Sequence, residues 1–167
     1  MSEPTTEQLA RVGAWIRSEA ASKSVDETHS YVLERLDRLY ACVADLATGQ
    51  LTAVSASEGW APLDALRHVV EWNWQVGEDI LHMCLTGERP GNPIPEFPAD
   101  REALVARQKE SIESVYAHVS AADPESFLAF TWEHPFFGML NWREWFLFLG
   151  VHTSDHTAQI KAMLANG

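Results

Sequence analysis

Apolar residues recur along most of the chain at intervals of three and four, the spacing that places them on one face of an α-helix. Four long segments show this pattern, with polar or charged residues at the intervening positions. They cover residues 24–47, 60–88, 101–121 and 141 to the C-terminus. No segment of useful length alternates apolar and polar residues as a half-buried strand does. The pattern therefore predicts an all-α protein, and four long helices favour a four-helix bundle.

Capping signals indicate where these helices begin. Ser24 and Glu27 have the spacing of a capping box, and Asn141 opens a second pair of this kind ahead of the last helix. Asp100 is placed to cap the third helix. Pro62 has the fixed φ that suits the first position of the second helix. Each long segment thus has a predicted start.

The segments outside the four helices define the rest of the organisation. A weaker helical pattern near residues 5–20 predicts an additional N-terminal helix, which we expect to pack outside the bundle or on a partner. The proline-rich segment 87–100 cannot continue a helix and predicts a loop that crosses the end of the bundle. We therefore divide the chain into an N-terminal extension, residues 1–24, and a four-helix bundle domain, residues 25–167.

Composition and charge narrow the class of protein. With 167 residues, 46% of them apolar and 22% charged, the chain has the size and composition of one soluble globular domain. No apolar run is long enough to span a membrane, and no secretory signal is visible, so we expect a cytoplasmic protein. The formal charge of −12 disfavours binding to nucleic acid. Cys42 and Cys84 lack metal or redox spacing and are expected to be reduced, buried thiols.

Two histidines, His152 and His156, interrupt the apolar face of the last helix. They belong to a run of positions, spaced by three and four, at which this helix should meet the bundle interior. Side chains four residues apart project from one face with Cβ atoms about 5–6 Å apart, so two ring nitrogens can bind one ion. The polar atoms of buried imidazoles need partners. The pair therefore predicts either a metal site or rings that hydrogen-bond to buried carboxylates or water.

A metal site would need a third ligand, because two imidazoles rarely hold an ion in water. His68 on the second helix is the candidate, although it borders the apolar stripe of that helix. His134, in the loop ahead of the last helix, could act as an acid or base at the site, or could stabilise its own turn. Glu71 and Asp155 stand near the candidate ligands and could accept a ring N–H, although a carboxylate on a helix is more often only solvated.

The other histidines and the aromatic residues carry less specific predictions. His29, His82 and His118 are expected at the surface or at its boundary. A set of aromatic side chains either fills the core and loops or forms an apolar pocket above the metal. The set comprises Trp72, Trp74, Trp132, Phe136, Phe137, Trp142 and Trp145.

The placement of the three candidate ligands resembles that in the DinB-like or YfiT-like proteins. The signature of that family is a histidine early in the second helix, after a tryptophan and a helix-starting turn, and a terminal H-x3-H-x2-Q-[IL] motif. The matching residues here are Trp60, Pro62, His68, His152, His156, Gln159 and Ile160. Residues 134–145 also resemble the segment that leads into the last helix of the family, and the resemblance covers residues 25–164.

This resemblance implies a bundle of up-down-down-up topology with a divalent metal, zinc or nickel, held by His68, His152 and His156. Known activities in the family are thiol-dependent: transferases that use bacillithiol or mycothiol, and a mycothiol-dependent maleylpyruvate isomerase. We therefore expect an S-transferase with a low-molecular-weight thiol as cosubstrate, a small-molecule substrate and a homodimeric state. Two other functions stay open, namely a hydrolase that uses metal-bound hydroxide, and a non-catalytic bundle that binds a ligand or partner.

Overall fold

The fold is that of a helical bundle with a short hairpin, seen in a computed structural model that describes residues 5–165. Four long helices form the bundle, and the described residues add two further helices and one two-stranded sheet. The elements are α1 (Thr6–Ser22), α2 (Val25–Ala44), α3 (Thr48–Thr52), α4 (Pro62–Thr86), α5 (Arg101–Val119), β1 (Trp132–His134), β2 (Gly138–Leu140) and α6 (Trp142–Ala165). The predicted all-α four-helix bundle is confirmed.

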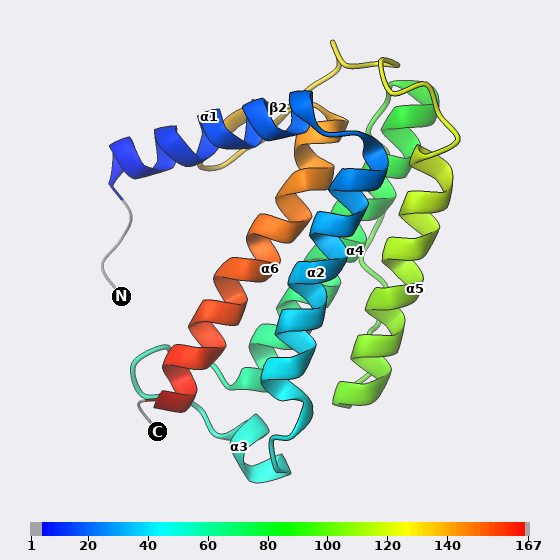
Figure 1. The fold of residues 1–167 in the computed structure, drawn as a ribbon. Coiled ribbons are helices and arrows are strands. Elements are labelled where there is room, and N and C mark those ends of the chain that lie inside the picture. The colour runs from blue at the N-terminus through cyan, green and yellow to red at the C-terminus, as the bar shows by residue number, and fades with distance from the viewer. Residues whose placement is uncertain (1–4, 166–167) are drawn as a thin grey trace.

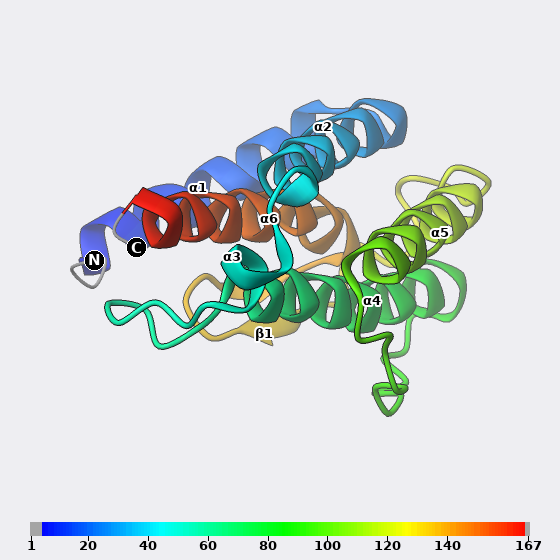
Figure 2. The same cartoon turned by 90° about the horizontal axis from the view of Figure 1, so that it is seen from below.

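The order of the long helices gives the expected up-down-down-up topology. Helix α2 descends in Figure 1, α4 and α5 both ascend, and α6 descends again. Seen from below, α6 lies between α2 and α4, and α5 packs beside α4 and also contacts α2 (Figure 2). Because α4 and α5 are consecutive and parallel, residues 87–100 must return along the length of the bundle. The prediction that this loop crosses one end was therefore wrong.

The predicted caps set the starts of the long helices. Ser24 and Glu27 form the capping box of α2, and Pro62 occupies the first turn of α4. The side chain of Asp100 accepts a hydrogen bond from Ala103 N at 2.8 Å, which satisfies one amide at the start of α5. Asn141 Oδ1 accepts from Glu144 N at 3.1 Å, and Glu144 in turn accepts from Asn141 N, so α6 also begins at a capping box.

One apolar core joins the four long helices. It includes large, fully buried side chains such as Leu36, Leu66, Ile112 and Phe146. Burial raises the pKa of the Cys84 thiol to about 11 and also raises that of Cys42, and neither cysteine forms a disulfide in residues 5–165. These thiols are buried and half-buried, respectively. Their surroundings favour unreactive structural roles.

His29 does not lie at the surface as expected. Its ring is buried and stacks on the Tyr116 ring at a centroid distance of 3.8 Å. Its Nε2 is 3.4 Å from Glu113 Oε1, so α2 and α5 contact each other here through aromatic and polar groups. The expected position at the surface or its boundary is found for His82, which is half-buried, and for His118, which is exposed.

Helix α1 and the β-hairpin lie together at the end of the bundle where α6 begins (Figure 1). Gly13, Ile16 and Ala20 form the buried face of α1, and Arg17 Nη2 donates a hydrogen bond to Phe137 O at 2.6 Å. In the hairpin Trp132 pairs with Leu140, and Gly138 turns the chain with a φ of 72°. No helix in residues 5–165 is long and apolar enough to cross a membrane.

Candidate metal centre

Three histidines converge at the seam between α4 and α6. His68 lies in the second turn of α4, and His152 and His156 lie one turn apart on α6. The Nε2 atom of His152 is 3.4 Å from that of His68 and 3.1 Å from that of His156. All three candidate ligand atoms lie within 4.8 Å of one another, so this group could hold a metal ion. The structure thus brings together the three residues that the sequence singled out.

The three rings lie at the margin of the bundle. Each of these histidines is half-buried, whereas the neighbouring Thr153 and Thr157 are buried. The expectation that His152 and His156 face the interior was therefore only partly right, because the most buried stripe of α6 runs beside them. A site in this position is accessible from outside, as a site for an exchangeable ligand requires.

A chain of hydrogen bonds fixes the protonation of the His152 ring. The hydroxyl of Thr153 donates to Leu149 O at 2.7 Å, so its oxygen accepts a bond from Asn73 Nδ2 at 3.1 Å. This places Asn73 Oδ1 3.3 Å from His152 Nδ1. Because a carbonyl oxygen can only accept, Nδ1 of His152 carries the hydrogen, and Nε2 of the neutral ring has a lone pair.

A second chain fixes His156 in the same way. A carboxylate can only accept, so Gln159 donates a hydrogen bond from Nε2 to Glu58 Oε2 at 3.2 Å. The amide is thereby oriented with Oε1 toward His156 Nδ1, at 2.8 Å. Nδ1 of His156 therefore also carries the hydrogen. In their neutral forms, both rings of α6 direct a bare Nε2 at the centre of the cluster.

These bare nitrogens fit a cation better than they fit one another. Two neutral imidazoles with lone pairs 3.1 Å apart cannot share a hydrogen bond, because neither Nε2 has a hydrogen to donate. Burial and the neighbouring histidines lower the pKa of His68 and lower that of His152 strongly, which keeps both rings neutral. Nitrogens bound to one tetrahedral zinc at about 2.0–2.1 Å would lie roughly 3.3–3.4 Å apart, close to the spacing seen here.

Among the described residues, the ring N–H groups do not pair with Glu71 or Asp155, the two carboxylates that the sequence offered as alternatives. Within residues 5–165, neither Glu71 nor Asp155 forms a hydrogen bond to a ring of the cluster, and Asp155 is exposed. Asn73 and Gln159 take that part instead. Both are side-chain amides. Asn73 is oriented by Thr153 and Gln159 by Glu58, and each of these partners is distant in sequence, so no local pattern reveals the contact.

An aromatic wall runs along the seam from the histidines to the hairpin. The Trp72 ring lies 4.2 Å from the His152 ring and contacts Trp145, which stacks on Trp132 at 4.6 Å between ring centroids. Phe148 packs against both Trp72 and Trp145. Of the predicted set, two members lie elsewhere: Trp74 packs on Phe97, and Trp142 is fully buried with Nε1 donating to Ser126 O.

Arg89 and Asp79 hold the far end of this wall. Asp79 is fully buried on α4, and its Oδ2 accepts from Arg89 Nε at 2.8 Å. The guanidinium carbon of Arg89 lies 5.2 Å from the centre of the Trp132 ring, a cation–π distance. This ion pair thereby fixes β1, and with it the aromatic wall, against the end of α4.

His134 lies in the same aromatic region, buried between Phe137 and Phe148. Its Nδ1 accepts a hydrogen bond from Phe136 N at 3.1 Å, so it stabilises its own turn. Burial lowers the pKa of His134 to about 4, which leaves the ring neutral with its hydrogen on Nε2. In this state Nε2 can donate a hydrogen bond but cannot accept a proton. An acid or base role for His134 stays a prediction.

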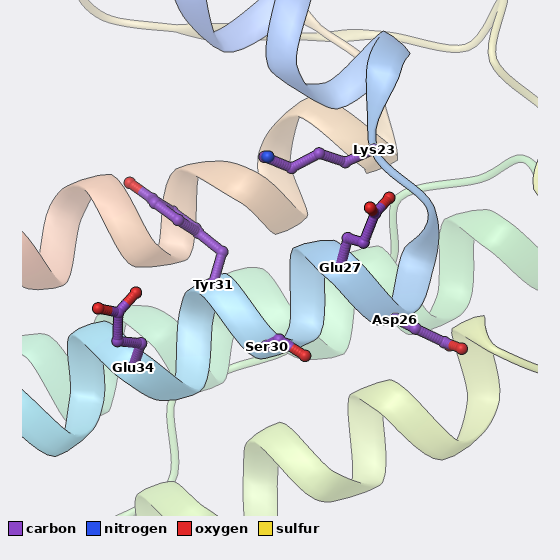
Figure 3. A pocket seen from close by; sticks show the side chains of 6 residues that line it. All are labelled: Lys23, Asp26, Glu27, Ser30, Tyr31 and Glu34. Atoms are coloured by element: carbon purple, nitrogen blue, oxygen red, sulfur yellow. The ribbon is translucent and has the colours of Figure 1, made fainter.

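A separate open hollow lies on α2 and the turn before it, with a volume of about 440 Å³ (Figure 3). Its lining is mostly charged or polar and contains none of the candidate site residues. It consists of Lys23, Asp26, Glu27, Ser30, Tyr31 and Glu34. Glu27 is already engaged in the α2 cap, and Lys23 pairs with Glu19. This hollow is therefore separate from the candidate metal centre.

Comparison with known proteins agrees with this fold. A search of curated proteins gives no match. Among solved structures, the "Crystal structure of TT2238, a four-helix bundle protein" is similar with a TM-score of 0.60 and 22% sequence identity, over 83% of this chain and 99% of that one. At this identity the likeness concerns the fold alone. The sequence model of the DinB superfamily matches residues 31–160, which include all three histidines of the cluster, and the chain belongs to the DinB superfamily.

Proposed function

We propose that the protein is a metalloenzyme that holds a divalent ion through Nε2 of His68, His152 and His156 and catalyses a thiol-dependent transfer. The observation that carries the metal site is the pair of bare nitrogens on α6. Asn73 and Gln159 fix both tautomers so that the lone pairs meet 3.1 Å apart, an arrangement that is repulsive without a cation. Zinc and nickel both accept imidazole ligands.

An ion in this site would act as a Lewis acid that lowers the pKa of a thiol or of water at its open position. Three neutral ligands leave its charge uncompensated, which favours an anionic nucleophile there. The residues of the chain would then place the second reactant. Trp72 and Phe148 offer an apolar surface beside His152, suited to an electrophile with an apolar or aromatic body.

Thiol transfer is favoured over hydrolysis by what surrounds the site. Attack by water is commonly assisted by a general base. Within residues 5–165 the candidate ligand group contains no carboxylate, the nearby carboxylate of Glu58 is engaged by Gln159, and the free nitrogen of the neutral His134 ring is a donor. A thiol loses its proton far more readily than water does, so it depends less on such a base. The resemblance to the family suggests bacillithiol or mycothiol as the cosubstrate. Hydrolysis is the alternative enzymatic function, and non-catalytic ligand binding is the alternative outside catalysis.

Metal analysis of untagged protein tests the first step. We expect about one zinc or nickel per chain after supplementation, and a loss of at least roughly tenfold in affinity for His68→Ala and His152→Ala. His82→Ala is the matched control, since this histidine of α4 lies outside the cluster. Full metal content in His68→Ala would contradict the proposed ligand set, and wild-type protein that binds no ion would leave only the non-catalytic function.

Cobalt substitution separates the two enzymatic functions. Addition of bacillithiol or mycothiol should produce a sulfur-to-cobalt charge-transfer band and turnover of an electrophilic substrate in the loaded protein. No spectral change with any thiol, together with ester or amide cleavage, would favour hydrolysis instead. We also propose, from the resemblance to the family, that the protein is a homodimer. Sedimentation at several protein concentrations tests this state.

A further inference from the structure

The turn before α4 places a carboxylate next to the histidine cluster. Backbone hydrogen bonds close this turn, from Ser55 N to Trp60 O at 2.9 Å and from Gly59 N to Ser55 O at 2.8 Å. Gly59 has a φ of 71°, a conformation that glycine adopts without strain. The turn holds Glu58 half-buried, with Oε2 3.2 Å from Gln159 Nε2 on α6. Glu58 therefore reaches the cluster through one intervening side chain.

We propose that Glu58 is a positioning residue of the site, which acts on His156 through Gln159. The side-chain amide of Gln159 has two faces, a carbonyl oxygen and an NH₂ group, and either could point at His156 Nδ1. Among residues 5–165, the bond to Glu58 decides between them, because the carboxylate must receive the NH₂ group. The oxygen is then left for His156 at 2.8 Å.

The orientation of this amide decides whether His156 can be a ligand. With the oxygen toward the ring, the hydrogen stays on Nδ1 and Nε2 offers its lone pair to the cluster. With the NH₂ group toward the ring, Nδ1 must accept, and the hydrogen moves to Nε2, where it blocks coordination. The amide of Asn73 is oriented in a comparable way by its hydrogen bond to Thr153. Each histidine of α6 therefore contacts an amide whose orientation is fixed by another residue.

The same turn also brings the aromatic ring of Trp60 to the histidine cluster. The Trp60 ring meets His68 edge-on at 5.2 Å between centroids and lies parallel to His156 at 6.3 Å. The bond between Glu58 and Gln159 ties this turn to α6. It also brings a negative charge within two hydrogen bonds of a ligand set that is otherwise neutral. Outer partners of this kind commonly change metal affinity by about 10–100-fold.

The effect of Glu58 on the tautomer of His156 can be measured without any metal. Its effect on metal affinity rests on the proposed function. In metal-free protein, nitrogen–proton correlation spectra of the histidine rings at about pH 7.5 report the tautomer directly. We expect His156 with its hydrogen on Nδ1 in the wild type, and a mixture of both tautomers in Glu58→Ala. Glu58→Gln, which disturbs the turn least, should also give a mixture, because two paired amides can adopt either orientation.

A swapped pair provides the rescue. In the double variant Glu58→Gln, Gln159→Glu, the carboxylate at 159 can only accept, both from His156 Nδ1–H and from the amide at 58. It should restore the Nδ1–H tautomer and bring zinc affinity to within about threefold of wild type, after a loss of about tenfold in Glu58→Ala. Asp155→Asn, which removes an exposed carboxylate adjacent to His156, is the control and should change neither property.

The possible outcomes separate the positioning role of Glu58 from the proposed metalloenzyme function. A pure Nδ1–H tautomer in both Glu58→Ala and Glu58→Gln would overturn the positioning role, even if the affinity fell, because Glu58 would then act only through charge or through the turn. A mixed tautomer with wild-type protein that binds no zinc would support the positioning of His156 and refute the proposed metalloenzyme.

Discussion

The Nε2 atoms of His152 and His156 lie 3.1 Å apart, although in the neutral form each ring gives its one hydrogen to an amide oxygen at Nδ1. Successive turns of α6 bring the rings this close, and Asn73 and Gln159 prevent either ring from turning its hydrogen toward the other. Such contact between lone pairs is unfavourable in a neutral cluster. It becomes favourable when both nitrogens bind the same positive charge.

Removal of the amide at position 73 should weaken metal binding. Asn73→Leu takes away the acceptor for His152 Nδ1–H and frees the ring to place its hydrogen on Nε2. We expect zinc affinity to fall by about 10–100-fold, measured by titration against a chelator of known affinity. Gln75→Leu is the control, since it removes an amide from the same helix that makes no hydrogen bond to the cluster. Equal losses in both variants would show that the effect is not specific to His152.

Protons should compete with the metal only at low pH. The lowered pKa values of His68 and His152 mean that neither ring must lose a proton before it binds an ion at neutral pH. Zinc affinity should therefore be nearly constant between about pH 7 and 8, and fall at more acidic pH as protons occupy the ligand nitrogens. The measurement is a competition titration at several pH values. A steep rise in affinity between pH 7 and 8 would contradict neutral rings.

The helices could be predicted because their determinants are local. The capping pairs begun by Ser24 and Asn141 lie within single turns, and the apolar spacing is a property of each helix alone. Three-residue strands such as β1 are too short for an alternating pattern, so the hairpin was missed. The path of residues 87–100 was mistaken because it depends on α4 and α5 being parallel, a tertiary relation that the segment itself does not encode.

The candidate site was only partly readable for the same reason. His152 and His156 could be paired from their spacing, but the position of His68 on the margin of α4 gave no clear signal, and the resemblance to the family supplied it. The contact between Glu58 and Gln159 spans 101 residues and joins a turn to a helix. Nothing near either residue predicts this contact, so the orientation of the amide, which determines the tautomer, became visible only in the structure.

His134 should make the protein less stable in acid. Its pKa of about 4 in the folded state lies below the ordinary value of 6.5, so the unfolded chain takes up a proton first as the pH falls. The contribution of His134 is complete above about pH 6.5 and is lost between there and about pH 4. His134→Asn keeps an acceptor for the Phe136 amide but does not titrate. The melting temperature of this variant in metal-free form should fall less than that of wild type between pH 7 and 5; parallel curves would exclude His134 as a cause.

The close approach of α2 to α6 depends on the absence of a side chain at Gly150. A Cβ atom built there would lie 2.8 Å from Cδ1 of Tyr31 and still closer to Cε1, so either the half-buried Tyr31 ring or one of the two helices must shift. We expect Gly150→Ala to lower the free energy of unfolding by about 1–3 kcal/mol, measured by urea denaturation. Because Gly150 stands two residues before His152, zinc affinity should fall as well.

Gly49→Ala is the matched control, because a Cβ atom at Gly49 meets nothing within 4 Å. Alanine also favours the helix there, so the stability of this variant should stay equal to that of wild type or rise slightly. A Gly150→Ala protein as stable as wild type would mean that Tyr31 moves aside freely and does not fix the position of α6.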